Sequence, residues 1–182
     1  MNKILPLINY GHKHFGENKI QEAIHKWTTI KTDFDDLQLH FVGKLQTNKV
    51  KYVIPLFDYI HSLDSHKLAE KIANEQIKKK KKIKIFIQVN IGQESQKNGI
   101  EIENLENFYR KCQKDFELNI IGLMCLPPIG KDSKIYFSKM HNLIKKINLK
   151  ELSMGMSNDY IYAIEHKSTF LRIGSQIFGV RN

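Results

Sequence analysis

The chain has 182 residues, which is enough for one domain with a buried core and short for two. Its formal net charge of +10 would suit an acidic partner, but the densest basic run, Lys78–Lys82, contains no aromatic residue or Arg that could stack on bases. We interpret that run as a solvated loop and expect no nucleic-acid partner. The two cysteines, Cys112 and Cys125, have neither metal-site nor disulfide-framework spacing. Because signal-peptide and membrane-spanning patterns are also absent from the sequence, we expect a cytoplasmic protein without metal or membrane partner.

Short apolar strands alternate with amphipathic helices along the chain. A helix is predicted from Asn2 to Lys13, with Gly11 as its C-cap, and Ser65 is the predicted N-cap of a later helix. Every strand but the last is followed by a helix, which is the repeat of a parallel sheet with right-handed crossovers. The seven predicted strands lie near Phe15, Phe41, Ile60, Phe86, Ile121, Leu152 and Leu171.

Two architectures fit this repeat, an open doubly wound sheet and a closed barrel. The barrel is favoured because polar residues follow most strands, whereas an open sheet concentrates its ligand loops at one switch point. These residues are Asn18, Gly43, Asp64, Asn90, Ser157 and Gly174. Eight strands close such a barrel, and here the first helix has no strand before it. We therefore predict a single α/β domain over residues 1–182, a (β/α)8 TIM-type barrel with seven strands that lacks its first, and an N-terminally truncated, marginally stable chain.

Two glycine- and serine-rich stretches near the chain end follow the last two strands. The strand Phe170–Ile173 leads into Gly174-Ser175, and Leu152–Asp159 places Ser157 between a strand and a helix. The loops after the last two strands of an α/β barrel often hold phosphate on backbone N–H groups. The alternative is that both are ordinary strand-to-helix turns, but their order and place in the chain favour a phosphate site.

Several motifs lie along the predicted strands and the segments that follow them. They are Phe15-Gly16-Glu17-Asn18 with Gln21-Glu22, His40-Phe41-Val42-Gly43-Lys44-Leu45-Gln46-Thr47-Asn48-Lys49, Ile60-His61-Ser62-Leu63-Asp64-Ser65, Ile87-Gln88-Val89-Asn90, Gly122-Leu123-Met124, Leu152-Ser153-Met154-Gly155-Met156-Ser157 and Arg172-Ile173-Gly174 with Ile177-Phe178-Gly179. Together these motifs resemble the YggS/PROSC family of pyridoxal 5'-phosphate homeostasis proteins, which are related in fold to the N-terminal barrel of alanine racemase. The resemblance covers the chain nearly end to end. It implies a barrel that carries pyridoxal 5'-phosphate, influences vitamin B6 and amino-acid balance, and has no established catalytic reaction.

The resemblance also implies cofactor-binding roles near the chain end. Ser157 would give its hydroxyl to the phosphate, with the backbone N–H groups of Gly174 and Ser175 completing the cradle. Arg172 would face the pyridine nitrogen, where a permanent cation keeps that nitrogen unprotonated and weakens the ring as an electron sink. We expect the Ser157 hydroxyl and the Ser175 N–H to lie within the span of a phosphate, roughly 6 to 8 Å.

Two weaker roles and one absence complete the implied site. Asn18 would lie beside the ring, with a turn residue as the alternative, and Met154 would pack near it. In the family a lysine at the end of the first strand holds the cofactor as a Schiff base, and that position precedes Met1 here. Lys3 belongs to the start of the first helix, so we expect binding of pyridoxal 5'-phosphate to be non-covalent at best.

The remaining candidate residues receive no cofactor role, and two other functions stay open. His40 and His61 lack a partner at metal-ligand spacing, so we interpret them as polar residues at strand ends, and we assign no role to His12 and His14. Lys167 stands where the family more often has Gly. The alternatives are an amino-acid racemase-like enzyme, disfavoured because no second domain supplies an opposing base, and an inactive fragment. We expect a monomer.

Overall fold

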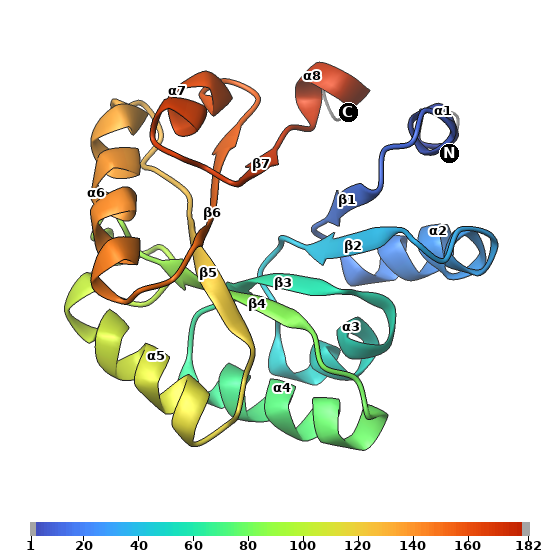
Figure 1. Cartoon of the computed structure of the whole chain (residues 1–182), viewed down its shortest axis with the longest axis horizontal. Coiled ribbons are helices and arrows are strands. Elements are labelled where there is room, and N and C mark those ends of the chain that lie inside the picture. The colour runs from blue at the N-terminus through green and yellow to red at the C-terminus, as the bar shows by residue number, and fades with distance from the viewer. Residues whose placement is uncertain (1–2, 180–182) are drawn as a thin grey trace.

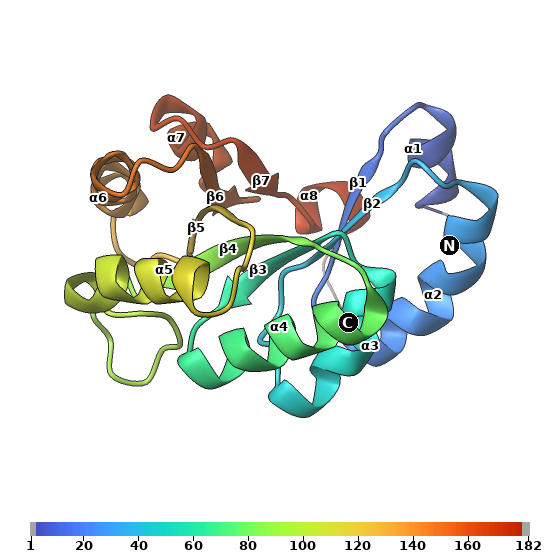
Figure 2. The same cartoon turned by 60° about the horizontal axis from the view of Figure 1, so that its bottom comes forward.

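The computed structural model describes residues 3–179, which form one sheet of parallel strands wrapped by helices (Figures 1 and 2). The strands are β1 (His14–Glu17), β2 (Gln38–Phe41), β3 (Tyr59–Leu63), β4 (Lys84–Val89), β5 (Ile120–Cys125), β6 (Glu151–Met156) and β7 (Phe170–Arg172). The helices are α1 (Leu5–Asn9), α2 (Ile20–Asp33), α3 (Val50–Leu56), α4 (His66–Lys79), α5 (Leu105–Lys114), α6 (Ser133–Lys146), α7 (Tyr160–Glu165) and α8 (Ser175–Phe178), with 3-10 turns at η1 (Thr47–Lys49) and η2 (Ile102–Asn104).

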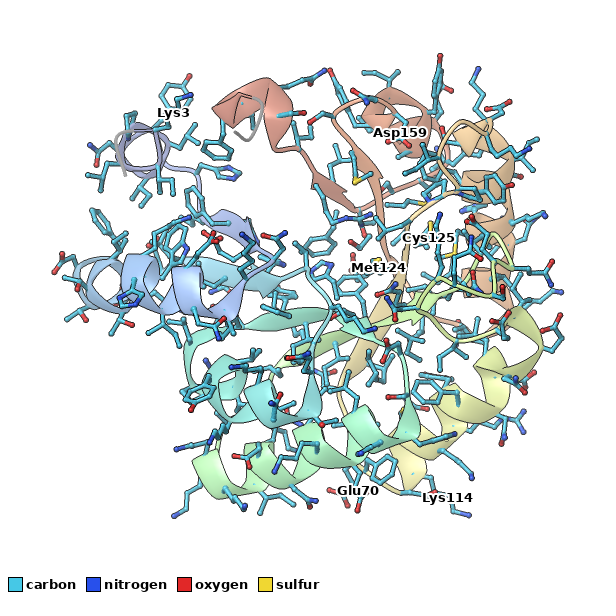
Figure 3. The ribbon with its side chains drawn as sticks, turned by 180° about the vertical axis from the view of Figure 1, so that it is seen from behind. Lys3, Glu70, Lys114, Met124, Cys125 and Asp159 are labelled. Atoms are coloured by element: carbon cyan, nitrogen blue, oxygen red, sulfur yellow. The ribbon has the colours of Figure 1, made fainter. Side chains whose placement is uncertain are left out.

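Each strand pairs in parallel with its neighbour in sequence, so the sheet order is β1-β2-β3-β4-β5-β6-β7. The predicted fold is confirmed as a nearly closed α/β barrel of seven parallel strands. In Figure 1 β1 and β7 flank the opening, with α1 and α8 beside them. The side chain of Lys3 joins these two sides, because its Nζ donates a hydrogen bond to the Phe178 carbonyl at 2.7 Å (Figure 3).

The main hydrophobic core lies between the sheet and the helices. In α4 the face predicted from helical spacing is the buried one, comprising Leu68, Ala69, Ile72 and Ala73. Ser65 is the N-cap as predicted, since its Oγ accepts from the Leu68 N–H at 3.4 Å. Alternating residues of the strands point outward into this core, and the helices cover them.

The first helix is shorter than predicted. It covers Leu5–Asn9, and Pro6 in its first turn suits a helix start. Gly11 follows with φ of 93°, a left-handed conformation that glycine adopts without steric cost. Asn2, where the prediction began, lies outside the described residues.

The lysine run lies at the junction of α4 and β4, but the predicted loop comprises only Lys80–Lys82, because Lys78 and Lys79 are still helical. Lys78 and Lys79 form the last helical turn, where their charge complements the negative end of the helix, and Lys80 ends the helix in the left-handed region with φ of 49°. Lys81 is less exposed than its neighbours, and its Nζ donates to the Pro55 carbonyl at 3.2 Å. The run therefore has a structural explanation as a helix end and turn.

The edge strand β1 is anchored to α2 through a buried carboxylate. Glu17 Oε1 accepts from Trp27 Nε1 at 2.8 Å and from Lys26 Nζ at 2.6 Å. Trp27 itself is almost completely buried. The paired Glu17 carboxylate therefore holds the end of β1 against α2, directly before Asn18.

Candidate functional site

The two predicted phosphate-binding loops meet at the carboxyl ends of β6 and β7. Ser157 Oγ accepts from the backbone N–H of Gly174 at 3.3 Å and from that of Gln176 at 3.5 Å. Ser175 lies between these two donors in the chain and is the first residue of α8. The Ser157 side chain is almost fully buried. The structure thus brings Ser157 and the N–H groups of the last loop to one point, an arrangement suited to an anion.

The first of these loops owes its shape to Gly155. Gly155 has φ of 91°, and a Cβ at this position would stand 2.5 Å from the Cβ of Ala163 in α7. Only glycine allows this close contact between β6 and the following helix. The turn is then closed by Asp159, whose Oδ1 accepts from the Met156 N–H at 2.7 Å (Figure 3). These contacts present the Ser157 hydroxyl toward β7.

Arg172 extends from β7 into the barrel interior. One guanidinium nitrogen donates to Ser153 Oγ at 2.7 Å, and the other donates to the Cys125 carbonyl at 2.8 Å. Burial lowers the pKa of Arg172 from its ordinary value, but arginine is protonated at every physiological pH. The side chain therefore fixes a cation between β5, β6 and β7, close in sequence to Gly174.

The remaining two predicted site residues are placed differently. Asn18 follows β1, the opposite edge strand, where it lines a cleft together with Lys44, Gln46 and Lys49. Met154 is fully buried in the core between sheet and helices, because its neighbour Ser153 takes the inward direction in β6. The structure does not bring Met154 into the barrel interior, and its role is packing.

The interior holds a chain of imidazoles that the sequence interpretation missed. His14 Nδ1 lies 2.9 Å from His40 Nε2, and His40 Nδ1 lies 2.9 Å from His61 Nε2. His61 Nδ1 in turn lies 2.8 Å from Ser153 Oγ, the atom that also accepts from Arg172. A continuous series of hydrogen bonds therefore runs from β1 across β2 and β3 to β6 and β7.

The predicted position of two of these histidines at strand ends was wrong. His61 is the central residue of β3, and His40 lies within β2, with both side chains buried. His14, to which no role was assigned, begins the series. One signal was present in the sequence, since each of these histidines is next to an outward-facing apolar residue of its strand, Phe15, Leu39 or Ile60. Three successive strands with a histidine in this place indicate a shared inner layer.

Aromatic rings fill the interior around the imidazoles. Tyr59, Phe86 and Met124 form a second hydrophobic cluster, separate from the outer core, and Phe170 packs against it. The ring centroid of Phe170 lies 5.6 Å from that of His40 and 6.0 Å from that of His61. Rings from β2, β3, β4 and β7 can meet in this way only inside the barrel.

Burial keeps the central imidazoles neutral. It lowers the pKa of His40 to about 3 and holds the pKa of His61 well below its ordinary value. Among the described residues 3–179, no group of three or more His, Cys, Asp or Glu side chains converges as metal ligands would. The series is therefore a hydrogen-bonded network rather than a metal centre.

Comparison with known proteins shows the family. The alanine racemase N-terminal domain family matches residues 1–182. A pyridoxal phosphate homeostasis protein from Aquifex aeolicus is 40% identical over 182 residues, which cover 95% of this chain and 79% of that protein. The chain belongs to the pyridoxal phosphate homeostasis protein family. This membership confirms the resemblance that the sequence motifs indicated.

Solved structures of this family agree with the fold. PipY of Synechococcus elongatus without pyridoxal phosphate is 33% identical, with a TM-score of 0.91 over 98% of this chain and 87% of that one. PipY with pyridoxal phosphate bound gives a TM-score of 0.86 over 97% of this chain and 86% of that one. An alanine racemase of Clostridium difficile, 14% identical with a TM-score of 0.74, shares the fold over 96% of this chain and 47% of its own.

The polar groups of this family member at the carboxyl ends of β6 and β7 are of a kind that suits an anionic ligand. The Ser157 hydroxyl and the N–H groups of Gly174 and Gln176 can bond the oxygens of an anion such as phosphate, and Arg172 is a fixed cation in the neighbouring strand. Within the described part of the chain, no helix is long and apolar enough to span a bilayer.

Proposed function

We propose that this chain binds pyridoxal 5'-phosphate at the carboxyl ends of β6 and β7 and takes part in vitamin B6 and amino-acid balance as a carrier, in the cytoplasm. The observation that carries the proposal is the meeting of Ser157 with the N–H groups that follow Arg172. Family membership supports it, as does the related PipY structure described as having pyridoxal phosphate bound.

The phosphate would be held by Ser157, Gly174 and Ser175. The N–H groups of Gly174 and Gln176, on either side of Ser175, donate to the Ser157 oxygen, so these two donors point toward one small volume. A phosphate could accept from the same N–H groups while Ser157 donates its own proton to a phosphate oxygen. The donors are thus arranged before the ligand arrives, which lowers the cost of ordering them on binding.

Arg172 would set the electronic character of the bound ring. Pyridoxal phosphate supplies an aldehyde and an electron-accepting pyridine ring when bound. A permanent cation beside the pyridine nitrogen opposes its protonation, because two positive charges repel at short range. The hydrogen bonds to Ser153 and Cys125 prevent Arg172 from moving away. This environment suits storage and transfer of the cofactor better than catalysis.

We further propose that binding depends on these non-covalent contacts. Lys3 Nζ donates to the Phe178 carbonyl, and Lys84 Nζ donates to the Tyr59 hydroxyl at 3.0 Å near the amino ends of the strands. Both amines are thus engaged elsewhere. Borohydride reduction of the protein mixed with pyridoxal phosphate, followed by peptide mass spectrometry, should give no stoichiometric adduct at a single lysine. One uniquely labelled lysine would contradict this part of the proposal.

Substitution of Ser157 by alanine tests the phosphate site. We expect roughly tenfold to hundredfold weaker binding of pyridoxal phosphate, because one hydrogen bond to a charged group contributes about 1.5–3 kcal/mol. Affinity would be measured by fluorescence titration of the wild type and of S157A. The matched control is Ser138→Ala, which removes an exposed hydroxyl from α6 and should leave the affinity unchanged.

Unphosphorylated pyridoxal makes the same test specific. It should bind the wild type and S157A with equal affinity, since it has no phosphate for Ser157 to contact. Equal affinity of both proteins for pyridoxal phosphate would overturn the assignment. If S157A bound both pyridoxal and pyridoxal phosphate more weakly, the substitution would not act through the phosphate group. That result would also contradict the phosphate-binding role of Ser157.

The alternative is a racemase-like enzyme, suggested by the match to the alanine racemase N-terminal domain family. Incubation with L-alanine and pyridoxal phosphate, followed by chiral chromatography, separates the two proposals. A carrier should show no turnover near the rates of ordinary enzymes, about 1 per second or more. Turnover in that range, lost in S157A, would favour the enzyme.

A further inference from the structure

The interior hydrogen-bond series contains five side chains from five strands. They are His14 of β1, His40 of β2, His61 of β3, Ser153 of β6 and Arg172 of β7, each within 2.9 Å of the next. His14 is exposed, whereas Ser153 is completely buried. The series therefore connects solvent at the β1 edge to the cation of the proposed cofactor site.

The direction of every hydrogen bond in this series follows from Arg172. A guanidinium can only donate, so Ser153 Oγ accepts from it. The hydroxyl proton of Ser153 then has His61 Nδ1 as its acceptor. The opposite arrangement would leave a buried hydroxyl proton without an acceptor, at a cost of about 1–3 kcal/mol. Ser153 therefore donates to His61.

This choice propagates along the imidazoles, because a neutral ring that accepts at one nitrogen donates from the other. His61 accepts at Nδ1 and so donates from Nε2 to His40 Nδ1. His40 then donates from Nε2 to His14 Nδ1. His14 is left with its Nε2–H at the exposed end. Without ligand, all three rings are thus in the Nε2–H tautomer.

The rings are held too tightly to change direction by rotation. His40 is stacked on Tyr59 with centroids 4.0 Å apart and an interplanar angle of 15°, and His61 is stacked on Phe86 at 4.3 Å and 20°. Phe170 presses on both. Reversal of the hydrogen bonds then requires protons to move along the bonds while the rings stay in place.

We propose that His14, His40, His61 and Ser153 form a proton relay between the Arg172 side of the barrel and solvent. When a group beside Arg172 gives a proton to Ser153 Oγ, the Ser153 hydroxyl proton passes to His61 Nδ1. The Nε2 proton of His61 passes to His40 Nδ1, that of His40 passes to His14 Nδ1, and the Nε2 proton of His14 leaves to water. One N–H or O–H bond forms for each that breaks, and every side chain ends neutral.

The relay then works in reverse without any ring flip. After one passage the three rings are Nδ1–H tautomers that donate toward Ser153. A proton from water that binds His14 Nε2 drives each proton one step back, and Ser153 returns one to the group beside Arg172. The relay thus alternates between two states, each set by the passage of one proton.

The charges around the relay favour its neutral states. Lys84 faces His14 and His40, and Arg172 faces His61, and these cations oppose protonation of the imidazoles. His12 also lies near His14, while Asp58 acts in the opposite direction on His40. Burial is the largest effect on His40 and His61, so an extra proton is disfavoured on both rings and the neutral states are favoured.

This step rests on the proposed function. If a ligand binds beside Arg172, the relay would accept a proton from it, so the ligand must be one that loses a proton on binding. A protonated nitrogen heterocycle is such a ligand, because the guanidinium disfavours a second cation next to it. Binding of pyridoxal phosphate should therefore release a proton from that fraction of the ligand that carries one on its ring nitrogen.

Histidine 15N spectra at neutral pH test the relay directly, because Nδ1 and Nε2 have different shifts when protonated. Without ligand, the rings of His14, His40 and His61 should all be Nε2–H tautomers. After saturation with pyridoxal phosphate, monitored by the 31P signal of the bound phosphate, they should be Nδ1–H tautomers. Mixed tautomers without ligand, or unchanged tautomers after saturation, would overturn the relay.

A blocked relay provides the second measurement. His40→Phe keeps an aromatic ring against Tyr59 but removes both nitrogens from the middle of the series. In stopped-flow mixing with pyridoxal phosphate and a pH-indicator dye, H40F should release the ligand proton more slowly than the wild type, because the path through His40 is broken. His25→Gln, on the exposed face of α2, is the matched control and should release the proton at the wild-type rate. An equal rate of release by H40F would overturn the relay.

Failure of the proposed function can be recognised separately. If no bound 31P signal appears, the protein does not take up pyridoxal phosphate and the cofactor assignment fails. The relay is then judged on ligand-free spectra of the wild type and of Ser153→Ala, in which His61 Nδ1 loses its donor. A shift of His61 away from the pure Nε2–H tautomer in S153A confirms the direction of the Ser153–His61 hydrogen bond on which the relay depends, and an unchanged His61 contradicts the relay.

Discussion

The two faces of the same barrel strands serve different purposes. On the outer face, residues such as Leu39, Ile60 and Leu152 are buried against the helices. They are apolar, and their contribution depends on the area they bury and not on specific hydrogen bonds. On the inner face, their neighbours His40, His61 and Ser153 make specific hydrogen bonds. The outer face supplies stability through buried area, and the inner face supplies a defined arrangement of donors and acceptors.

The largest effect should come from the outer face. Ile60→Ala removes a fully buried side chain in β3 and should lower the free energy of unfolding by about 2–5 kcal/mol through lost burial and a cavity. Urea unfolding followed by circular dichroism would measure it. Ile77→Ala, which truncates a side chain that is 75% exposed, should change stability by no more than about 0.5 kcal/mol. Similar losses in both variants would mean that the outer face is not the stabilising one.

The inner face should respond to pH instead. The pKa of His40 is about 3 in the folded protein because of burial, against the ordinary 6.5 expected when unfolded. Between these values the unfolded chain binds the proton more readily, so stability is complete above about pH 6.5 and is lost as the pH falls toward 3. The slope from His40 should approach about 1.4 kcal/mol per pH unit.

The variant H40F isolates this contribution. Urea unfolding of the wild type and of H40F at pH 7, 6, 5 and 4 should show a shallower pH dependence for H40F, whatever its stability at neutral pH. The carboxylates titrate in both proteins and cancel in the comparison. Parallel curves would show that His40 is not held neutral by burial.

The smallest effect is expected at a residue that belongs to neither face. Lys167 connects α7 to β7 with φ of 66°, a conformation that costs a side chain with a Cβ about 1–2 kcal/mol. Lys167→Gly removes this strain but adds freedom to the unfolded chain, so a gain of about 0.5–1 kcal/mol is expected. Thermal unfolding measures it, and a loss of stability in K167G would show that the lysine makes a stabilising contact.

The outer face was predictable from the sequence, and the inner face was predictable only in part. Alternation of apolar residues gave the strands, helical spacing gave the buried face of α4, and glycine and serine near the chain end gave the loop that meets Ser157. These signals are local. The same alternation places Met154 outward once Ser153 is taken as inward, and a strict use of the two-residue period would have predicted its packing role.

The imidazole series could not be predicted because its partners are far apart in the chain. His14 and His40 are separated by 26 residues, and His61 and Ser153 by 92. A single histidine among apolar residues fits a buried, a catalytic or a surface role equally well. Only the closure of the sheet, which brings β3 opposite β6, decides between these roles.

The strand order has a consequence for how the protein is made. Because each strand pairs with the one before it, the growing chain can add one strand and helix at a time to an existing sheet edge, through contacts that are short in sequence. The contacts of the proposed site are different, since the bond from Arg172 to the Cys125 carbonyl spans 47 residues and requires the last strand. During synthesis the scaffold can form early, whereas the ligand site is completed only when β7 has left the ribosome. A nascent chain should therefore be unable to form the proposed pyridoxal phosphate site until β7 has emerged.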